Sequence, residues 1–431
     1  MACRALTIAA LVLLASAAAG AAEGPWSRFR GPNGSGLADA PNLPVTWTDK
    51  DYNWKVRLPG SGHSSPVLWG NRIFVTCTDA ETARRTLLCL DTADGRTVWR
   101  RDDPSKPFGM HGDNSFASAT PAADADGVVV TWTTPNQIVL LALDPDGREV
   151  WRRDLGPIIS AHGSGVSPIF FGDLVVLAND QENMNYMPGG DPKSRERPIG
   201  KSSLIAVDRK TGRTRWQIER RSGYAAFSTP CVYQPEGGPP ELIVTSTAHG
   251  ITSVDPATGA VNWEVPDIFL DRCVGSPVTA PGLVIAGYGT GTRGTLYVAV
   301  RPGSREKGEK PTIAYSLQKT VPLVPTPVVK GGRLFFWYDD GMAACLNVAT
   351  GEVLWRERIG GPCYGSPVCV GNRLYGITRG GEVIVVAASD KFEVLGRVPL
   401  GELSYATPAV ADGVMYLRTH TQLFSLGARK P

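Results

Sequence analysis

The segment Leu-Asp-Thr-Ala-Asp-Gly-Arg-Thr-Val-Trp, residues 90–99, is the part of the sequence that decides the fold. It joins the end of an aliphatic strand to an acidic turn with glycine, and then to a tryptophan. The aspartate can accept hydrogen bonds from turn amides, and glycine tolerates the positive φ that such turns require. The tryptophan offers a large flat surface for burial. This combination predicts a strand–turn–strand unit that packs against a neighbouring unit.

The segment recurs along the chain. Further copies occupy residues 143–151, 207–216, 254–263 and 346–355, the last with Asn347 in place of aspartate. Two repeats have lost the signature, and Tyr315 and Leu395 stand where their tryptophans are expected. The residues predicted to dock one repeat on the next are Trp54, Trp99, Trp151, Trp216, Trp263 and Trp355.

A second element recurs eight times, namely a serine or threonine followed by proline and an aliphatic run. The copies begin at Ser65, Thr120, Ser167, Thr229, Ser276, Thr326, Ser366 and Thr407. Proline can open a strand where no ladder amide is needed. A further hairpin separates the two elements, so each repeat predicts four short antiparallel strands, A to D. Spacings of roughly 40 to 60 residues are those of propeller blades.

The eighth repeat is incomplete, because the chain ends before its strand D. The segment 54–58, Trp-Lys-Val-Arg-Leu, has the character of a strand D without a repeat of its own. Pairing it with the last repeat would leave no exposed sheet edge. We therefore predict an all-β, eight-bladed β-propeller of four-stranded antiparallel blades, closed by an N-terminal strand near Trp54.

Composition and the N-terminus favour an exported protein. The apolar run from Leu6 to Ala15, followed by small residues, predicts a signal peptide over residues 1–22. Residues 23–50 are expected to form an N-terminal extension, and residues 51–431 the single propeller domain. We expect a periplasmic or secreted protein with no membrane span or lipid anchor. With 44 basic and 41 acidic residues and no basic run, a nucleic-acid partner is not expected.

Seven cysteines follow the predicted signal peptide, and none forms a closely spaced metal-binding pair. Cys77 and Cys89 lie on consecutive predicted strands and are the best candidates for a disulfide. For most of the cysteines, a role as small buried apolar residues is expected instead.

The repeated Asp–Gly–Trp signature resembles the tryptophan-docking repeat of the PQQ-like propeller superfamily. That superfamily includes quinoprotein dehydrogenases and the lipoprotein subunit of the outer-membrane β-barrel assembly machine. Residues 26–36, which contain Phe29-Arg30-Gly31-Pro32, also resemble the leader of exported bacterial PQQ-like repeat proteins of unassigned role. A shared fold does not by itself transfer function.

The dehydrogenases of this superfamily need a quinone on an aromatic floor, a calcium ion and an aspartate base. Many of them also have a disulfide between adjacent cysteines, and this chain has no adjacent cysteines. No trio of Glu, Asn and Asp matches theirs residue by residue. We therefore predict no cofactor, with PQQ and calcium as the alternative.

Candidate binding residues gather in the loops between strands D and A and between strands B and C. These loops open on one face of a propeller, and loops on a rigid scaffold often carry function. The residues expected at the mouth of the channel are His63, His111, Asp113, Asn114, His162, Asp180, Gln181, Arg221 and Tyr224. Each histidine could equally serve to hold a loop backbone.

Three functions remain open. The first is a non-catalytic envelope binding or scaffold protein that presents its loop-rich face to a protein, peptide or glycan. The second is a PQQ-dependent oxidoreductase acting on alcohols or sugars. The third is a metal- or small-ligand-binding propeller that uses His63, His111 and His162, although their uneven spacing does not establish a metal site.

Overall fold

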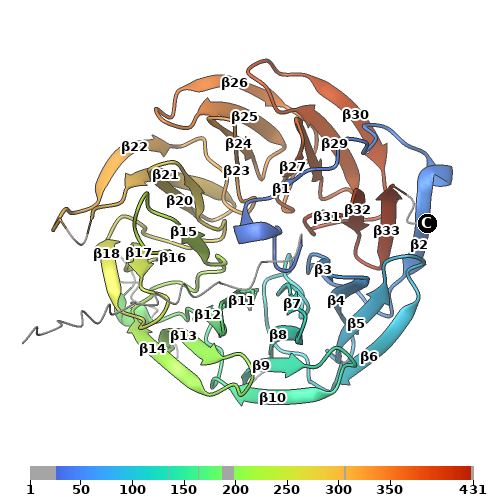
Figure 1. Ribbon diagram of the computed structural model, residues 1–431, viewed down its shortest axis with the longest axis horizontal. Helices are drawn as coiled ribbons and strands as arrows, with labels where there is room; N and C mark the ends of the chain where they lie inside the picture. The colour runs from blue at the N-terminus through green and yellow to red at the C-terminus, as the bar shows by residue number, and fades with distance from the viewer. Residues whose placement is uncertain (1–25, 135, 164, 187–198, 305–306, 429–431) are drawn as a thin grey trace, which may run out of the picture.

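The computed structural model describes residues 26–134, 136–163, 165–186, 199–304 and 307–428, which form a closed ring of sheets (Figure 1). Within these ranges the strands make eight sheets, each with four antiparallel strands ordered A to D from the axis to the rim, and the short strand β1 (Leu37–Ala38) adds a fifth, parallel strand to blade 7. The eight-bladed propeller predicted from the repeats is confirmed. The predicted signal peptide lies outside the described residues.

The strands of the eight blades follow one another around the ring. Blades 1 and 2 contain β3 (Val67–Trp69), β4 (Arg72–Thr78), β5 (Arg85–Asp91), β6 (Thr97–Asp103), β7 (Ala122–Asp124), β8 (Gly127–Thr133), β9 (Ile138–Leu143) and β10 (Glu149–Asp154). Blades 3 and 4 contain β11 (Ile169–Phe171), β12 (Leu174–Asn179), β13 (Ser202–Asp208), β14 (Thr214–Arg220), β15 (Cys231–Tyr233), β16 (Glu241–Ser246), β17 (Gly250–Val254) and β18 (Val261–Val265). Blades 5 and 6 contain β19 (Val278–Ala280), β20 (Leu283–Thr290), β21 (Arg293–Arg301), β22 (Thr312–Gln318), β23 (Val328–Lys330), β24 (Arg333–Trp337), β25 (Met342–Asn347) and β26 (Val353–Arg358). Blades 7 and 8 contain β27 (Val368–Val370), β28 (Arg373–Ile377), β29 (Glu382–Ala387), β30 (Val394–Pro399), β31 (Ala409–Ala411), β32 (Val414–Arg418), β33 (Gln422–Gly427) and β2 (Tyr52–Arg57). The described residues also contain β1 (Leu37–Ala38) and the short 3-10 helices η1 (Pro32–Gly34), η2 (Asp49–Asp51) and η3 (Met184–Tyr186).

The ring closes where the sequence predicts. Strand β2 pairs antiparallel with β33, with Trp54 opposite Ser425 and Lys55 opposite Phe424. In Figure 1 the blue β2 lies beside the dark red β33. The last blade therefore takes its outer strand from the beginning of the propeller sequence, and its edge is covered.

Neighbouring blades are joined by the repeated tryptophans. Trp99 of β6 donates its indole N–H to the carbonyl of Pro145, in the turn between β9 and β10 of the next blade, at 2.8 Å. The glycine of that turn, Gly147, has φ 82°, and a Cβ on it would lie 2.7 Å from the Trp99 ring. Glycine is thus required both for the turn and for the close approach of the indole. The same contact is made by Trp54 on Gly95, Trp151 on Gly212 and Trp216 on Gly259.

The degenerate fifth blade keeps this arrangement with a different side chain. Tyr315 on β22 donates to the carbonyl of Val348 at 2.9 Å, and its ring lies against Gly351. Trp263 faces the fifth blade, which has no Asp–Gly turn, and donates instead to Glu241 Oε2 at 2.8 Å. Tyrosine therefore occupies the docking position at Tyr315, as the sequence indicates.

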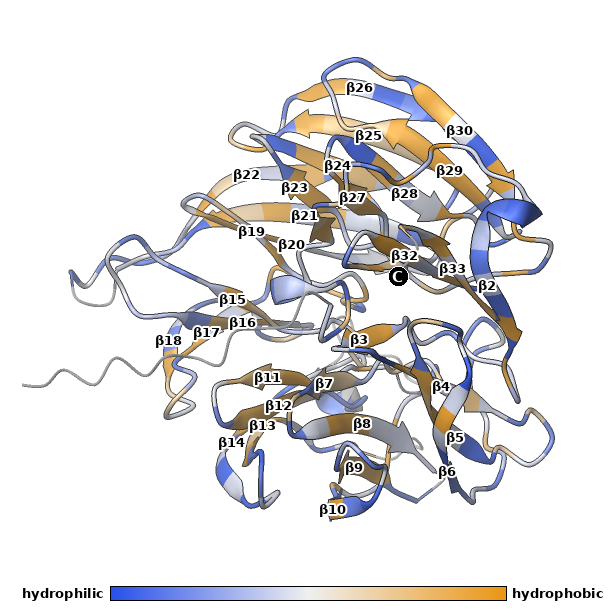
Figure 2. Cartoon of the chain, turned by 45° about the vertical axis from the view of Figure 1, so that its right-hand side comes forward, coloured by the Kyte–Doolittle hydropathy of each residue, from blue (hydrophilic) through white to orange (hydrophobic). Residues whose placement is uncertain are grey.

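The core of each blade lies on its middle strands. Every residue of β5, β8 and β9 is buried, because these strands are covered on both faces by neighbouring blades. Outer strands such as β14 alternate between exposed and buried residues. Figure 2 shows this as orange stretches on strands such as β12 and β25, with blue at many turns and loops.

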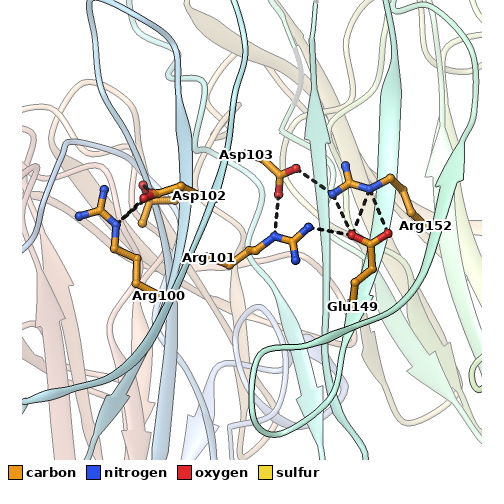
Figure 3. A network of polar contacts seen from close by, with 7 residues as sticks. Arg100, Arg101, Asp102, Asp103, Glu149 and Arg152 are labelled. Atoms are coloured by element: carbon orange, nitrogen blue, oxygen red, sulfur yellow. Dashed lines mark hydrogen bonds and ion pairs between the residues drawn. The ribbon is translucent and has the colours of Figure 1, made fainter.

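Charged side chains connect the outer strands of blades 1 and 2 (Figure 3). Arg101 of β6 lies 2.8 Å from Glu149 of β10, and Arg152 of β10 lies 2.7 Å from Asp103 of β6. Pairs at a solvated rim contribute about 0–1 kcal/mol each, so burial of the tryptophans has the larger effect on blade docking.

Residues 26–50, expected as an extension preceding the propeller, begin inside the ring (Figure 1). The Trp26 carbonyl accepts the amide of Leu68 in blade 1, and β1 pairs in parallel with β27 of blade 7. Arg30 is fully buried and donates to the carbonyls of Thr326, Pro327 and Pro367 at 2.7–3.1 Å. We call residues 26–38 the plug, because they contact strands A of blades 1, 4 and 7 from inside the ring.

The seven cysteines within the described ranges are buried and unbridged. The expected disulfide between Cys77 and Cys89 is therefore absent, since Cys77 pairs with Thr86 and Cys89 pairs with Phe74 in the β4–β5 ladder. Their role as small buried residues accounts for both positions. No helix in the described part of the chain is long and apolar enough to cross a membrane.

Candidate functional site

A ring of hydroxyl groups surrounds the axis where strands A begin. The amide of Ser65 donates to the Thr120 hydroxyl of the next blade at 2.9 Å, and the Thr120 amide donates in turn to Ser167 at 3.0 Å. Seven such bonds of 2.9–3.1 Å link the eight repeats, including one from Thr407 of blade 8 to Ser65 of blade 1. We call these eight residues the hydroxyl ring. It explains why serine or threonine precedes the proline of every repeat.

A second ring of side chains lies two residues before each member of the hydroxyl ring. Its members are His63, Ser118, Gly165, Phe227, Val274, Val324, Tyr364 and Tyr405, and all of them line one cavity together with the hydroxyl ring. We call these residues the variable ring, because its side chains range from glycine to tyrosine. The cavity has a volume of about 260 Å³. We call it the cup.

The plug contributes to the cup from within the ring. Phe29 lines the cavity, beside the buried Trp26 and Arg30. Burial of Arg30 lowers its pKa to about 9. The remaining walls come from loops between strands D and A and between strands B and C, which lie on one face.

His63 belongs to a histidine pair at one side of the cup. Its Nε2 lies 3.2 Å from Nε2 of His420, and its ring centre lies 4.5 Å from that of Tyr405, with the two rings tilted by 46°. Burial, the neighbouring His420 and the guanidinium of Arg418 lower the pKa of His63 to about 3. His63 is therefore neutral at neutral pH, and one of the two imidazoles can donate to the other.

Asp113 connects two distant loops across the mouth. It forms an ion pair with Arg379 of blade 7 and accepts hydrogen bonds from Tyr364 at 3.2 Å and Tyr405 at 3.4 Å. The Arg379 guanidinium also lies 4.4 Å from the centre of the Tyr364 ring. Asp113 thus already has a positive partner and is not a free base.

A second histidine pair comes from the loops that lead into blades 2 and 3. The rings of His111 and His162 stack at 5.0 Å, and Asn114 donates to the carbonyl of His162 at 2.6 Å. His162 Nδ1 lies 3.3 Å from Arg272 Nη1. Burial and the charge of Arg272 lower the pKa of His162 to about 4, so this histidine is also neutral at neutral pH.

Asp339 is the other carboxyl group that lines the cup. It accepts the amides of Leu323 at 2.7 Å and Val324 at 3.0 Å. Burial raises its pKa to about 6, although these hydrogen bonds act in the opposite direction. The cup can therefore change its charge close to physiological pH.

The structure brings five of the predicted mouth residues to the cup, namely His63, His111, Asp113, Asn114 and His162. It does not bring the three predicted histidines into one ligand set, because His63 pairs with His420 while His111 pairs with His162. No group of three metal-ligating side chains occurs within the described residues.

Four predicted residues lie away from the cup. Asp180 and Gln181 are buried between loops, where Gln181 Oε1 accepts the amide of Ile159 at 3.0 Å. Arg221 is exposed and lies over the ring of Tyr186 at 6.0 Å. Tyr224 lies behind the cup wall, with its ring 5.7 Å from the Arg272 guanidinium.

Sequence reasoning missed Phe29, Arg272, Asp339, Tyr364 and Tyr405 as lining residues. A periodic signal for two of them was present, since Tyr364 and Tyr405 stand two residues before Ser366 and Thr407, as His63 stands before Ser65. The other three belong to loops and the plug, whose approach to the axis no repeat encodes.

A comparison with known protein families shows which family this chain belongs to. The sequence model of the family described as outer membrane protein assembly factor BamB matches residues 40–117, 89–322 and 316–422. The chain belongs to this family. Its membership agrees with the PQQ-like repeats read from the sequence. No curated protein matches the sequence in a direct comparison.

Solved structures share the fold at low sequence identity. BamB from Moraxella catarrhalis is 13% identical with a TM-score of 0.59, over 86% of this chain and 98% of that one. A europium-containing methanol dehydrogenase is 13% identical with a TM-score of 0.53, over 84% and 89% of the two chains. The computationally designed Ika8 protein is 11% identical with a TM-score of 0.56, over 88% and 100%. At these low sequence identities, the similarity shows only that the propeller fold is shared.

The cup residues do not match a PQQ and calcium site. Within the described residues none of the cup-lining side chains is a tryptophan, and the repeated tryptophans lie between the outer parts of the blades. The two lining carboxyl groups are already engaged, Asp113 by Arg379 and Asp339 by backbone amides. Calcium usually takes six to eight oxygen ligands, several of them carboxylate. The cup therefore offers no carboxylate that is available to bind a calcium ion.

Proposed function

We propose that this chain is a non-catalytic binding protein of the cell envelope, which uses its loop-rich face to recognise a protein, peptide or glycan. The observation that carries the proposal is the cup. A rigid ring, plugged from within, presents one concave site on the face where the long loops gather. Membership of a family described as an outer membrane assembly factor supports a partner in the envelope.

The charges of the cup support binding rather than catalysis. His63 and His162 are neutral at neutral pH, each lies against a second histidine ring, and Asp113 is held by Arg379. A general base needs a pKa near the working pH and access to a substrate proton. Asp339 meets the first requirement, but both of its oxygens face backbone amides.

Affinity capture from envelope extracts tests this proposal. We expect Arg221→Glu, an exposed change on the loop-rich face, to reduce capture of the partner at least tenfold. Arg215→Glu is the matched control, because it reverses the same charge on the outer strand β14 of the same blade. Equal partner profiles for the two variants and the wild type would contradict recognition by this face.

A spectroscopic experiment tests the non-catalytic part of the proposal. The purified protein is incubated with PQQ and calcium, and bound chromophore and dye reduction with alcohols or sugars are measured. We expect neither. A stoichiometric bound quinone with dye reduction would instead support the oxidoreductase alternative.

A further inference from the structure

The walls of the cup are chemically unequal. In the variable ring, Phe227, Val274 and Val324 come from consecutive loops and form an apolar sector. Phe29 of the plug and Leu323 also line the cavity. An aliphatic or aromatic group would be shielded from water against these side chains, which favours binding of an apolar group.

A positive charge stands beside this apolar sector. Arg272 lines the cup, and its side chain is 14% exposed. Its Nη1 faces the neutral His162, while its Nε lies 3.7 Å from Asp271, which is not among the lining residues. Apart from this ion pair with Asp271, the guanidinium meets no carboxylate within 4 Å among the described residues, so its other N–H groups can serve a ligand in the cup.

The hydroxyl ring provides further donors. Seven of its oxygens accept a backbone amide from the preceding repeat, so each hydroxyl still has its own O–H to donate. O–H and guanidinium donors together favour an acceptor such as a carboxylate. The volume of about 260 Å³ lies below the 300–1,000 Å³ typical of drug-sized ligands, and is suited to a group the size of a single residue.

We propose that the cup binds a carboxylate attached to an apolar group, as presented by a peptide whose last residue has an apolar side chain. This inference rests on the proposed function and names the chemistry of the partner. Arg272 binds the carboxylate, the apolar sector and Phe29 contact the terminal side chain, and the hydroxyl ring holds the remaining oxygen. Backbone before the terminal residue leaves through the loop-rich face.

Calorimetry with a matched pair of small probes tests the charge requirement. N-acetyl-L-phenylalanine carries the carboxylate, and N-acetyl-L-phenylalaninamide differs only by lacking it. We expect the acid to bind at least tenfold more tightly, since only the acid offers a charged acceptor to Arg272. Equal affinities, or no binding of the acid at 10 mM, would overturn the proposal.

Two variants locate the site. Arg272→Gln is expected to remove the preference for the acid. Gly165→Phe is expected to block both probes, because the nearest atoms to a Cβ there are 3.6 Å away and a larger side chain would extend into the cup. Arg215→Gln, an exposed arginine outside the cup, should bind as the wild type does. Unchanged binding by both cup variants would place the ligand elsewhere.

A pentapeptide ending in phenylalanine distinguishes a chain end from a free acid. We expect it to bind at least as tightly as the acetylated amino acid, and its C-terminal amide to bind more weakly. Binding of the small acid alone would contradict a chain end as the partner. If Arg221→Glu loses capture of the partner but none of the probes binds to the wild-type protein, the proposed function stands. Only the inference about the cup is then rejected.

Discussion

Two carboxyl groups, those of Asp180 and Asp339, show how strongly the position of a residue in the fold controls its contacts and its role. Asp180 is buried, and neither of its oxygens has a hydrogen-bond partner, although Arg220 Nε lies 3.9 Å away. Burial raises its pKa to about 6. Asp339 has a similar pKa but lines the cup and accepts two amides. One carboxyl group therefore affects stability, whereas the other faces the proposed ligand.

Asp180→Asn tests the cost of the buried charge. The folded pKa of about 6 exceeds the model-compound value of 3.8, so wild-type stability from this group declines as the pH rises through 6. Relative to wild type, the variant should gain about 2 kcal/mol in unfolding free energy between pH 4 and pH 8. Urea unfolding at both pH values measures this, with the exposed Asp173→Asn as control. A pH-independent difference would contradict a raised pKa.

Asp339→Asn tests the charge of the cup. In the wild type, protonation below pH 6 removes a negative charge near the ligand, so N-acetyl-L-phenylalanine should bind more tightly at pH 5.5 than at pH 7.5. Asp340, Tyr297, Cys363 and Tyr364 interact electrostatically with the same carboxyl group. The variant should bind with little pH dependence over this range. The same dependence of affinity on pH in the wild type and the variant would assign the effect to another titratable group.

At the scale of the elements, the turn between strands C and D joins one blade to the next. The Asp208 carboxylate accepts the amides of Lys210 at 3.2 Å and Thr211 at 2.9 Å, which shapes the turn. Gly212 then lies under the indole of Trp151. The Asp–Gly–Trp spacing is therefore a contact between two blades as well as a local turn motif.

A pair of glycine variants in blade 3 separates these two roles. Gly212 has φ 66°, and a Cβ there would lie 2.7 Å from Trp151, whereas Gly172 has φ 55° and nothing within 4 Å. Gly172→Ala should cost about 1–2 kcal/mol from backbone strain alone. Gly212→Ala should cost about 3–4 kcal/mol, because the indole must also move. Equal losses in chemical denaturation would mean that the tryptophan contact adds nothing.

At the scale of the whole molecule, the ring is closed twice. Strand β2 completes the last blade at the rim, and the Thr407 amide bonds the Ser65 hydroxyl at the axis at 3.1 Å. The plug adds a third connection, because Arg30 joins carbonyls of blades 6 and 7. The cup depends on all three, since its lining residues come from every blade.

Trp54→Ala tests closure at the rim. Trp54 donates to the carbonyl of Thr92 at 3.0 Å and is nearly buried, so its truncation should cost about 3–5 kcal/mol. Trp355→Ala, at a docking position between blades 6 and 7, should cost a similar amount. Only the Trp54 variant should also form soluble oligomers in size-exclusion chromatography, because loosening β2 exposes the edge of β33. Identical elution of both variants would contradict this view of closure.

The sequence alone determined the eight blades, the tryptophan positions and the closing strand. Each of these depends on a local pattern, such as Asp91 to Trp99 or the strand around Trp54, repeated at a regular spacing. Only the tertiary structure decided that His63 meets His420, that Asp180 is buried and that Phe29 enters the cup. The reason is physical: strand and turn patterns specify contacts within a blade and with the next blade. Contacts across the axis depend on how long loops and the plug satisfy their own backbone groups, and no repeat encodes those conformations.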